Sequence, residues 1–138
     1  MIIVETDYTK YLSRARTLLL YDAQMSFKNQ YWERCFNDIY RACINAVSAL
    51  LCKNKMNAKT YADLKIEFGR QFVKTGKIAK EDGDFLIALM DQRYESEYGD
   101  FSNIVERFTF FKEETVEPLF VPAKKFLQDI EELIGHND

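Results

Sequence analysis

Glycine, proline and histidine are scarce in this chain of 138 residues, which contains five glycines, two prolines and one histidine. Glycine and proline supply most tight turns, so their shortage argues against an all-β fold. The one histidine, His136, lies in the frayed end that follows the last expected helix. We therefore do not expect it to act in catalysis, although histidine is the side chain best suited to proton transfer near neutral pH.

Paired cysteines and long apolar runs are also missing. Cys35, Cys43 and Cys52 are odd in number and lack the C-x-x-C spacing of a zinc site, and the sequence contains no other cluster typical of metal ligands. We therefore expect reduced, mostly structural thiols and neither a metal nor another cofactor. The apolar run at the N-terminus is too short for a signal peptide, and no later run has the length of a membrane span. These features predict a cytoplasmic protein that does not contact membranes.

The charged residues are unevenly distributed along the chain. The formal net charge of −3 gives no general attraction to nucleic acid. Residues 53–80, however, contain eight basic and two acidic side chains, whereas residues 113–138 contain seven acidic side chains and two lysines. The first segment is either an anion-binding surface or, with the second, one of two solvated faces. The length of the chain suits one core, so we expect a single domain over residues 1–138.

Apolar residues recur at helical spacing through most of the chain, which predicts an all-α, antiparallel up-and-down bundle of four to five helices. The expected helices cover about residues 7–27, with Thr6 or Asp7 as the cap, and then 31–51, 60–76, 79–98 and 113–134. Pro122 should bend the last helix or delay its start. The aromatic segment 101–111 is open to two interpretations, a helical turn or an extended stretch whose exposed phenylalanines form a contact surface.

The stretch 85–100 contains the most unusual pattern of the chain. An apolar helical stripe that begins at Phe85 continues into two charged residues, Arg93 and Glu97. An inward-facing arginine must be paired, hydrated in a cleft or shared with a second subunit, because an unpaired buried charge is costly. Gly99 follows at a position where many helices end with a residue in the left-handed conformation.

A polar stripe lies in the expected helix 31–51. Asp38, Arg41, Asn45 and Ser48 follow one another at spacings of three and four residues, which places them on one helical face. In a helix this hydrophobic, such a face meets either solvent or a polar interface. The stripe is therefore either exposed or one wall of a cleft that also contains Arg93.

Three segments of the sequence resemble segments of HEPN domains (higher eukaryotes and prokaryotes nucleotide-binding), in particular those of the short stand-alone prokaryotic members. They are NDIYRACINAVSALL from Asn37 to Leu51, FVKTGKI from Phe72 to Ile78 and RYESEYGD from Arg93 to Asp100. The resemblance implies a helical bundle that forms a homodimer through the helices bearing its functional residues. It also implies one of two activities: a ribonuclease toxin, often beside a nucleotidyltransferase-like antitoxin, or a non-catalytic protein that binds RNA, a nucleotide or a partner protein.

The ribonuclease motif of that family, Arg-x4-His in its shortest form, is degenerate in this chain. Arg93 is present, but Tyr98 stands at the position of the histidine. Similar sequences often have histidine at the positions of Asn45 and Tyr61, and arginine at the position of Asp38. Metal-independent RNA cleavage needs a group that takes a proton near neutral pH, and tyrosine is a poor base there.

The sequence patterns and the resemblance to HEPN domains together give a set of candidate residues and three functional hypotheses. The candidate ligand-binding residues are Arg93, Tyr94, Glu97, Tyr98, Asp38, Arg41, Asn45 and Tyr61. We expect a non-catalytic dimer that binds RNA, a nucleotide or a partner protein in a toxin–antitoxin or defence context. The first alternative is a ribonuclease with a composite catalytic site of Arg93 and Tyr98 from two subunits. The second is a structural or adaptor protein that uses the aromatic segment 101–111 as its contact surface. Independently of these hypotheses, Arg93 and Glu97 could form only an ion pair within one helix, buried at a dimer seam.

Overall fold

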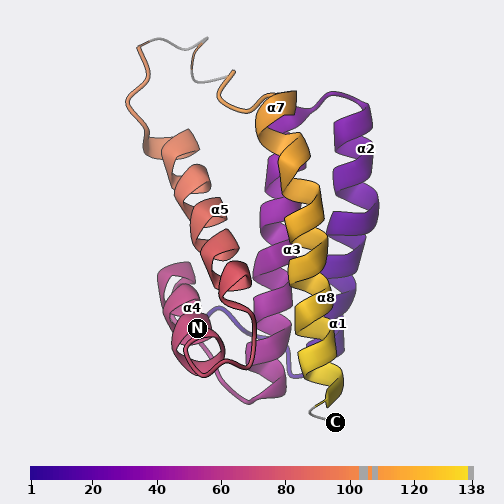
Figure 1. Ribbon diagram of the computed structural model, residues 1–138, viewed down its shortest axis with the longest axis vertical. Helices are drawn as coiled ribbons and strands as arrows, with labels where there is room; N and C mark the ends of the chain where they lie inside the picture. Colours follow the sequence, from indigo (N-terminus) through magenta and orange to yellow (C-terminus); the bar gives the residue numbers. More distant parts are fainter. Residues whose placement is uncertain (103–105, 107–108, 137–138) are drawn as a thin grey trace.

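The computed structural model describes residues 1–102, 106 and 109–136, and within these ranges the regular structure is entirely helical (Figure 1). The longer elements run up and down beside one another, as expected of a bundle. The predicted all-α class and the predicted bundle are confirmed. In the described part of the chain no helix is both long and apolar enough to cross a membrane.

The first expected helix is a single rod of three segments. These are α1 (Tyr8–Thr17), the π-helical turn η1 (Leu18–Asp22) and α2 (Ala23–Lys28). Asp7 rather than Thr6 is the cap, because its side chain accepts a hydrogen bond from the amide of Thr9. The π-helical turn inserts one extra residue into the helical repeat, and the apolar stripe remains buried on both sides of it.

Helix α3 (Trp32–Lys53) is the central element. Thirteen of its 22 residues are buried, and it packs against α1, α2 and the C-terminal helix α8 (Phe120–His136). Two of its residues, Cys35 and Cys43, are buried free thiols, and burial raises the pKa of Cys35 to about 12. Unreactive, reduced thiols of this kind agree with the structural role expected from the sequence.

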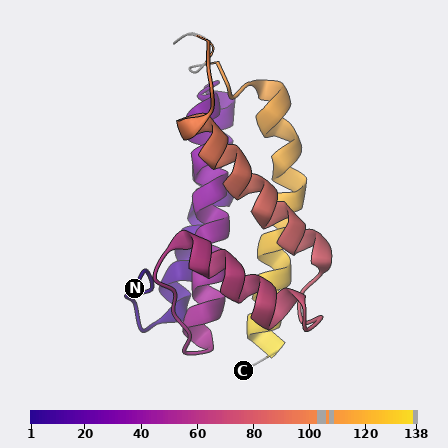
Figure 2. The same cartoon turned by 90° about the vertical axis from the view of Figure 1, so that its left-hand side faces the viewer.

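Helices α4 (Tyr61–Phe68) and α5 (Lys80–Tyr98) form a second layer on α3 and α8. The side chain of Thr60 caps α4 through the amide of Asp63, and a second π-helical turn, η2 (Gly69–Val73), continues it. Figure 2 shows α4 running across the bundle and α5 crossing α3 and α8 obliquely. The oblique course of α5 brings its C-terminal end above α3, where the candidate site lies.

Gly99 ends α5 for a different reason from the one the sequence suggested. Its φ of −66° lies outside the left-handed region, so the predicted conformation is wrong. A Cβ atom at this position would instead come within 2.5 Å of the backbone oxygen of Glu95. Glycine is therefore needed because the chain leaves the helix by passing close to its own last turn.

The last expected helix is divided where the prolines occur. It consists of α7 (Glu113–Val116), the 3₁₀ turn η3 (Glu117–Leu119) and α8, which begins only at Phe120. Pro122 lies in the first turn of α8, where its missing N–H has no cost, so the predicted delay is confirmed.

The aromatic segment 101–111 is only partly described, because residues 103–105 and 107–108 lie outside the described residues. Phe111 is buried and stacks on Phe36 with 4.2 Å between ring centroids, and Phe110 packs edge-on against Phe111. The prediction of exposed phenylalanines is therefore wrong for Phe111, which closes the end of the core instead. Phe108 of the same segment lies outside the described residues.

Candidate functional site

A cavity of about 670 Å³ opens between the first half of α3, the start of α4 and the end of α5. We call it the arginine cleft. It is lined by Arg34, Asn37, Asp38, Tyr40, Arg41, Tyr61, Arg93 and Glu97. Five of the eight candidate ligand-binding residues thus lie around one cavity, although they come from three helices that are far apart in the sequence.

Arg93 and Glu97 form one wall of the arginine cleft. The Nη2 atom of Arg93 lies 2.5 Å from Oε1 of Glu97, so the ion pair within one helix is present. The side chains are 30% and 38% exposed, and the pair therefore borders the cavity instead of being sealed in the core. A guanidinium group has five N–H donors, and most of those of Arg93 remain available to a ligand.

Asp38 and Arg41 form the opposite wall on α3. Asp38 is buried, and its Oδ2 accepts a hydrogen bond of 2.9 Å from Oγ of Ser26. Burial raises the pKa of the Asp38 carboxyl, and the hydrogen bond from Ser26 offsets only part of this effect. Arg41 is exposed at the rim. The cleft therefore contains a carboxyl group that accepts a proton more readily than usual, and the positive charge of Arg41 lies on the same wall.

The other half of the predicted polar stripe does not reach the cavity. Asn45 donates to the backbone oxygen of Arg41, and Ser48 is buried and donates to that of Ile44, each over 2.8 Å. Their polar groups are satisfied by their own helix, as is common for such residues within helices. The stripe as a whole is neither an exposed face nor a cleft wall, and the predicted ligand-binding role of Asn45 has no support in this geometry.

Tyr94 and Tyr98 lie outside the cleft. Their side chains are 67% and 69% exposed, and the two rings pack against each other with 5.0 Å between centroids. Within one chain, Tyr98 therefore does not line the cavity that Arg93 lines. The two candidate catalytic residues are not brought together by the fold of a single subunit.

Three residues of the arginine cleft were not among the candidates. Arg34 and Asn37 precede Arg41 by seven and four residues on α3, a spacing that identifies one helical face. The Oδ1 atom of Asn37 is buried without a hydrogen-bond partner in the described part of the chain, which leaves a polar group of the cleft wall unsatisfied. Burial also raises the pKa of Tyr40, and Tyr61 and Glu97 raise it further against the effect of Arg93.

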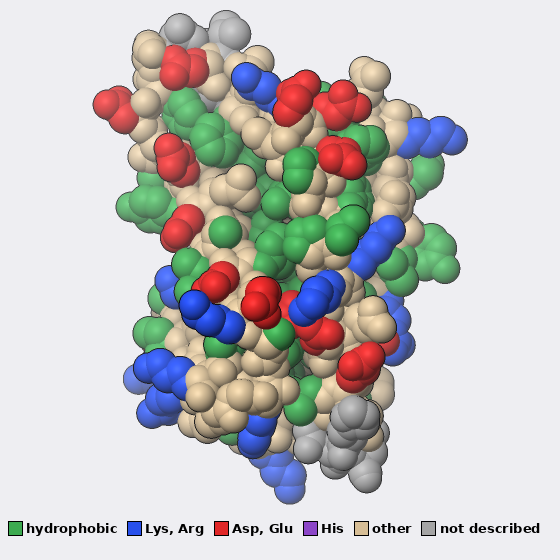
Figure 3. Space-filling model, in the orientation of Figure 1, with side chains coloured by type: hydrophobic (Ala, Val, Ile, Leu, Met, Phe, Trp, Pro, Cys, Tyr) green, Lys and Arg blue, Asp and Glu red, His purple; other side chains and the backbone are tan. Residues whose placement is uncertain are grey.

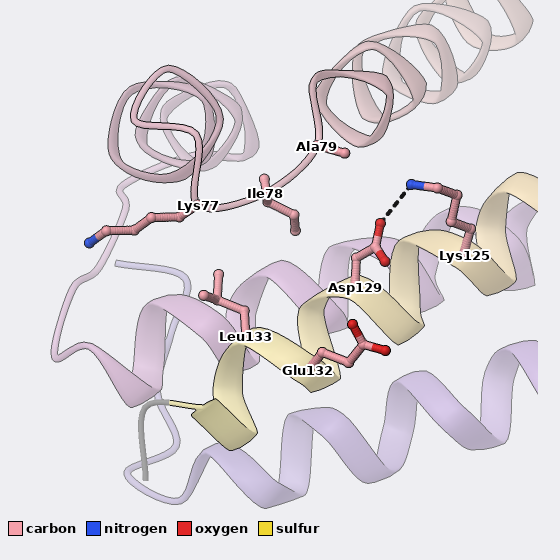
Figure 4. A pocket seen from close by; sticks show the side chains of 7 residues that line it. All are labelled: Lys77, Ile78, Ala79, Lys125, Asp129, Glu132 and Leu133. Atoms are coloured by element: carbon pink, nitrogen blue, oxygen red, sulfur yellow. Dashed lines mark hydrogen bonds and ion pairs between the residues drawn. The ribbon is translucent and has the colours of Figure 1, made fainter.

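A second cavity of about 430 Å³ lies where α8 meets the loop before α5 (Figure 4). It contains none of the candidate residues. Figure 4 shows Lys125 paired with Asp129 on α8, over 2.7 Å, and the buried Asp82 of α5 lies 3.6 Å from the same ammonium group. Burial and the neighbouring Asp129 raise the pKa of Asp82 to about 7. Among the described residues no group of three or more side chains is arranged to hold a metal. Because Asp82, Lys125 and Asp129 join α5 to α8, we treat this cluster as a contact between helices.

Comparison with known proteins identifies the family. The HEPN domain profile matches residues 8–133, which is most of the chain. A UPF0332 protein of Thermotoga maritima is 35% identical over 125 residues, which cover 91% of this chain and 89% of that protein. The match extends over every helix that contributes to the arginine cleft. On these grounds the chain belongs to the HEPN domain family.

Proposed function

We propose that this HEPN-family chain is a binding protein whose arginine cleft holds a phosphate-bearing ligand, either single-stranded RNA or a nucleotide. One observation carries the proposal: Arg34, Arg41 and Arg93 surround a single cavity that also contains two tyrosines. A guanidinium group binds phosphate oxygens in bidentate fashion, and tyrosine rings accept stacked bases. Membership of a family associated with nucleotides and RNA is in keeping with this chemistry.

Binding without efficient cleavage agrees best with the ionisable groups of the cleft. Cleavage of RNA without a metal requires a base for the ribose 2′-hydroxyl and an acid for the leaving oxygen. Among the described residues that line the cavity there is no histidine. Tyr40, which does line it, has a pKa raised above that of free tyrosine, and this makes it a still weaker acid–base catalyst near neutral pH.

A ribonuclease is the second candidate, and one observation favours it. Burial raises the pKa of Asp38, which is the direction that makes a carboxyl group better suited to general acid–base catalysis. It lies in the same cavity as Arg93, which could stabilise a developing negative charge. The alternative composite site of Arg93 and Tyr98 requires a second subunit, which would have to supply the tyrosine.

The wider setting that we propose rests on the family alone. It comprises a cytoplasmic homodimer, a nucleotidyltransferase-like antitoxin as partner, and a role in a toxin–antitoxin or defence system. The exposed aromatic pair Tyr94 and Tyr98 supports an interface on α5, because aromatic residues are enriched at the centres of protein interfaces. An adaptor role would instead use the aromatic segment 101–111 and would need no ligand in the cleft.

Fluorescence anisotropy tests the proposal directly. The probes are a labelled single-stranded RNA of mixed sequence and a labelled ATP, with a chelator present. Arg93→Ala should weaken binding about 10- to 100-fold, the effect of losing one or two charge-assisted hydrogen bonds. The matched control is Arg16→Ala, since Arg16 is also paired with a glutamate, Glu131, but lies on α1. Wild-type protein that binds neither probe, or equal affinities for the two variants, would refute the proposal.

Cleavage followed in the same samples separates the two candidates. If RNA is cut and Asp38→Asn abolishes cutting while binding persists, the ribonuclease hypothesis replaces ours. If Tyr98→Phe abolishes cutting instead, the composite site is correct, and light scattering should then show a dimer. Intact RNA bound by a folded protein supports the binding function.

A further inference from the structure

A small apolar groove lies between α4, η2 and the start of α5, separate from the arginine cleft. It has a volume of about 200 Å³, and its floor consists of Phe68 and Leu86, both almost wholly buried. One wall is Val73 of η2, and the other is Ile87 of α5, whose side chain remains 44% exposed. An apolar cavity of about 150 Å³ already accepts a benzene ring. This groove therefore has room for one leucine or phenylalanine side chain.

The groove is open because the chain places glycine at its edge. Gly69 has ordinary helical dihedral angles, and a Cβ atom added there would meet nothing within 4 Å. Alanine would be the better helix former at such a position, so glycine leaves space at a cost in stability. Gly83 on the other side is different, because its Cβ would lie 3.0 Å from Val73. It lets α5 approach η2 closely, whereas Gly69 keeps the groove unfilled.

The rim of the groove is positively charged. Lys65, Lys74 and Lys80 line it together with one acid, Asp84. Within the described part of the chain none of the three lysines takes part in an ion pair. Figure 3 shows basic side chains gathered on the side of the molecule where α4 lies, whereas acidic ones predominate at the opposite end. The local charge is complementary to an acidic ligand.

We propose that this lysine-rimmed groove binds an acidic segment of a partner protein, which inserts one large apolar side chain between η2 and α5. The anchor would bury the exposed part of Ile87, and acidic residues on either side of it would pair with Lys65, Lys74 and Lys80. A short anchor with matching flanking charges is a usual way to obtain a weak, specific contact. The proposal does not depend on what the arginine cleft binds.

Other occupants agree less well with the groove. Its floor is sealed by buried side chains, so it presents no open aromatic face for stacking of nucleic-acid bases. A second copy of this chain would have to supply an exposed apolar residue with acidic neighbours. Tyr94 and Tyr98 are exposed beside Glu95 and Glu97, but their rings pack against each other. Their hydroxyl groups would also meet the apolar floor of Phe68 and Leu86 without a hydrogen-bond partner. A separate acidic partner is therefore the better match.

Methyl NMR of the full chain tests the proposal with defined peptides. The probe is acetyl-EELFEE-amide, and the controls are KKLFKK, with reversed charge, and EEGSEE, without an anchor. We expect only the first peptide to shift the methyl signals of Ile87 and Val73, with a Kd of about 1 mM or lower. Gly69→Leu fills the groove and should weaken binding at least about tenfold, a loss of about 1.4 kcal/mol. The matched control is Gly135→Leu, because Gly135 is another helical position where a Cβ meets nothing within 4 Å.

Two further variants keep the test decisive. If Gly69→Leu fails to fold, Ile87→Gln should weaken binding by a similar factor. Lys74→Gln combined with Lys80→Gln should weaken it several-fold at low salt, whereas Lys28→Gln combined with Lys124→Gln should not.

Three results would overturn the proposal. The first is the absence of any shift at millimolar EELFEE, and the second is equal binding of KKLFKK. The third is self-association of the protein that Gly69→Leu abolishes, which would make a second copy of the chain the occupant.

Discussion

Replacing Asp82 by asparagine should stabilise the protein at about pH 8, and the gain should be clearly smaller at about pH 5 and vanish below about pH 4. Asp82 is only 2% exposed, and burial is the main cause that raises its pKa from 3.8 to about 7, with Asp129 adding to the effect. In the unfolded chain the same carboxyl loses its proton near its ordinary pKa. Between these two values the folded state binds one proton more than the unfolded state, so stability falls as the pH rises. Asparagine imitates the protonated carboxyl and cannot ionise.

The magnitude follows from the width of the pH window. For each pH unit in which only the folded state holds the proton, the free energy of unfolding falls by about 1.4 kcal/mol. Between about pH 5 and the raised pKa of about 7 there are roughly two such units, so the gain from asparagine should grow by at most about 3 kcal/mol from pH 5 to pH 8. Water entry and local relaxation reduce the effect of burial in real proteins, so we expect about 1–2 kcal/mol. For a domain of this size that corresponds to a difference of several degrees in Tm, at about 3 °C per kcal/mol.

Urea denaturation at a series of pH values measures the effect. Both proteins should carry His136→Gln, because histidine also titrates in this range. The free energy of unfolding of the Asp82 protein should fall relative to that of Asp82→Asn from about pH 5 to pH 8. Asp129→Asn should reduce this dependence by removing the neighbouring negative charge, and Asp84→Asn, an exposed change on the same helix, should not. An Asp82→Asn protein that is less stable than its parent at the higher pH would show that the pairing with Lys125 outweighs the cost of burial, and our reasoning would be wrong.

The remaining predictions concern packing, a backbone hydrogen bond and the cleft. Gly69→Ala should raise the free energy of unfolding by about 1 kcal/mol through helix propensity, whereas Gly83→Ala should gain nothing or lose stability, because its Cβ would press on a neighbouring valine; urea titration compares the two. Tyr11→Phe should cost about 1–2 kcal/mol in the same assay, since the Tyr11 hydroxyl accepts hydrogen bonds of 2.9 and 3.1 Å from two backbone amides near the N-terminus. Glu97→Gln should increase the affinity for the RNA probe several-fold in anisotropy, and unchanged or weaker binding would contradict a phosphate site at this wall of the cleft.

The sequence predicted the helices well because each one depends on signals that act locally. The Asp7 and Thr60 caps, the apolar stripes and the prolines before α8 all operate within a few residues. The π-helical turns η1 and η2 were missed. An inserted residue changes the register of an apolar stripe by one position, and in Leu18–Asp22 adjacent leucines occupy both registers. Packing against α3 decides which register is used, and a single sequence does not contain that information.

Some of the candidate residues line the arginine cleft and others do not, and helix geometry explains the difference. On a helix, a residue four positions after Arg93 returns to nearly the same face, but one five positions later is rotated away by about 140°. Glu97 therefore shares the cleft with Arg93, whereas Tyr98, at the motif position, faces outward. Arg34 and Asn37 were not among the predicted residues. Their spacing to Arg41 was sufficient to place them on the same face.

The ion pair of Arg93 with Glu97 does not oppose a binding role for the cleft. A pair whose two side chains are about one-third exposed is worth at most about 1 kcal/mol, because water competes for both charges. A bidentate contact between the same guanidinium and a phosphate is stronger, at about 1.5–3 kcal/mol, and it can form without breaking the pair completely. Glu97 therefore reduces the affinity for an anion but holds the guanidinium at the cavity wall, so that less conformational entropy is lost when a ligand arrives. If the cleft binds an anion in this way, the charged pair within the apolar stripe of α5 costs the free protein little stability. In the complex, the same pair positions the guanidinium group for the ligand.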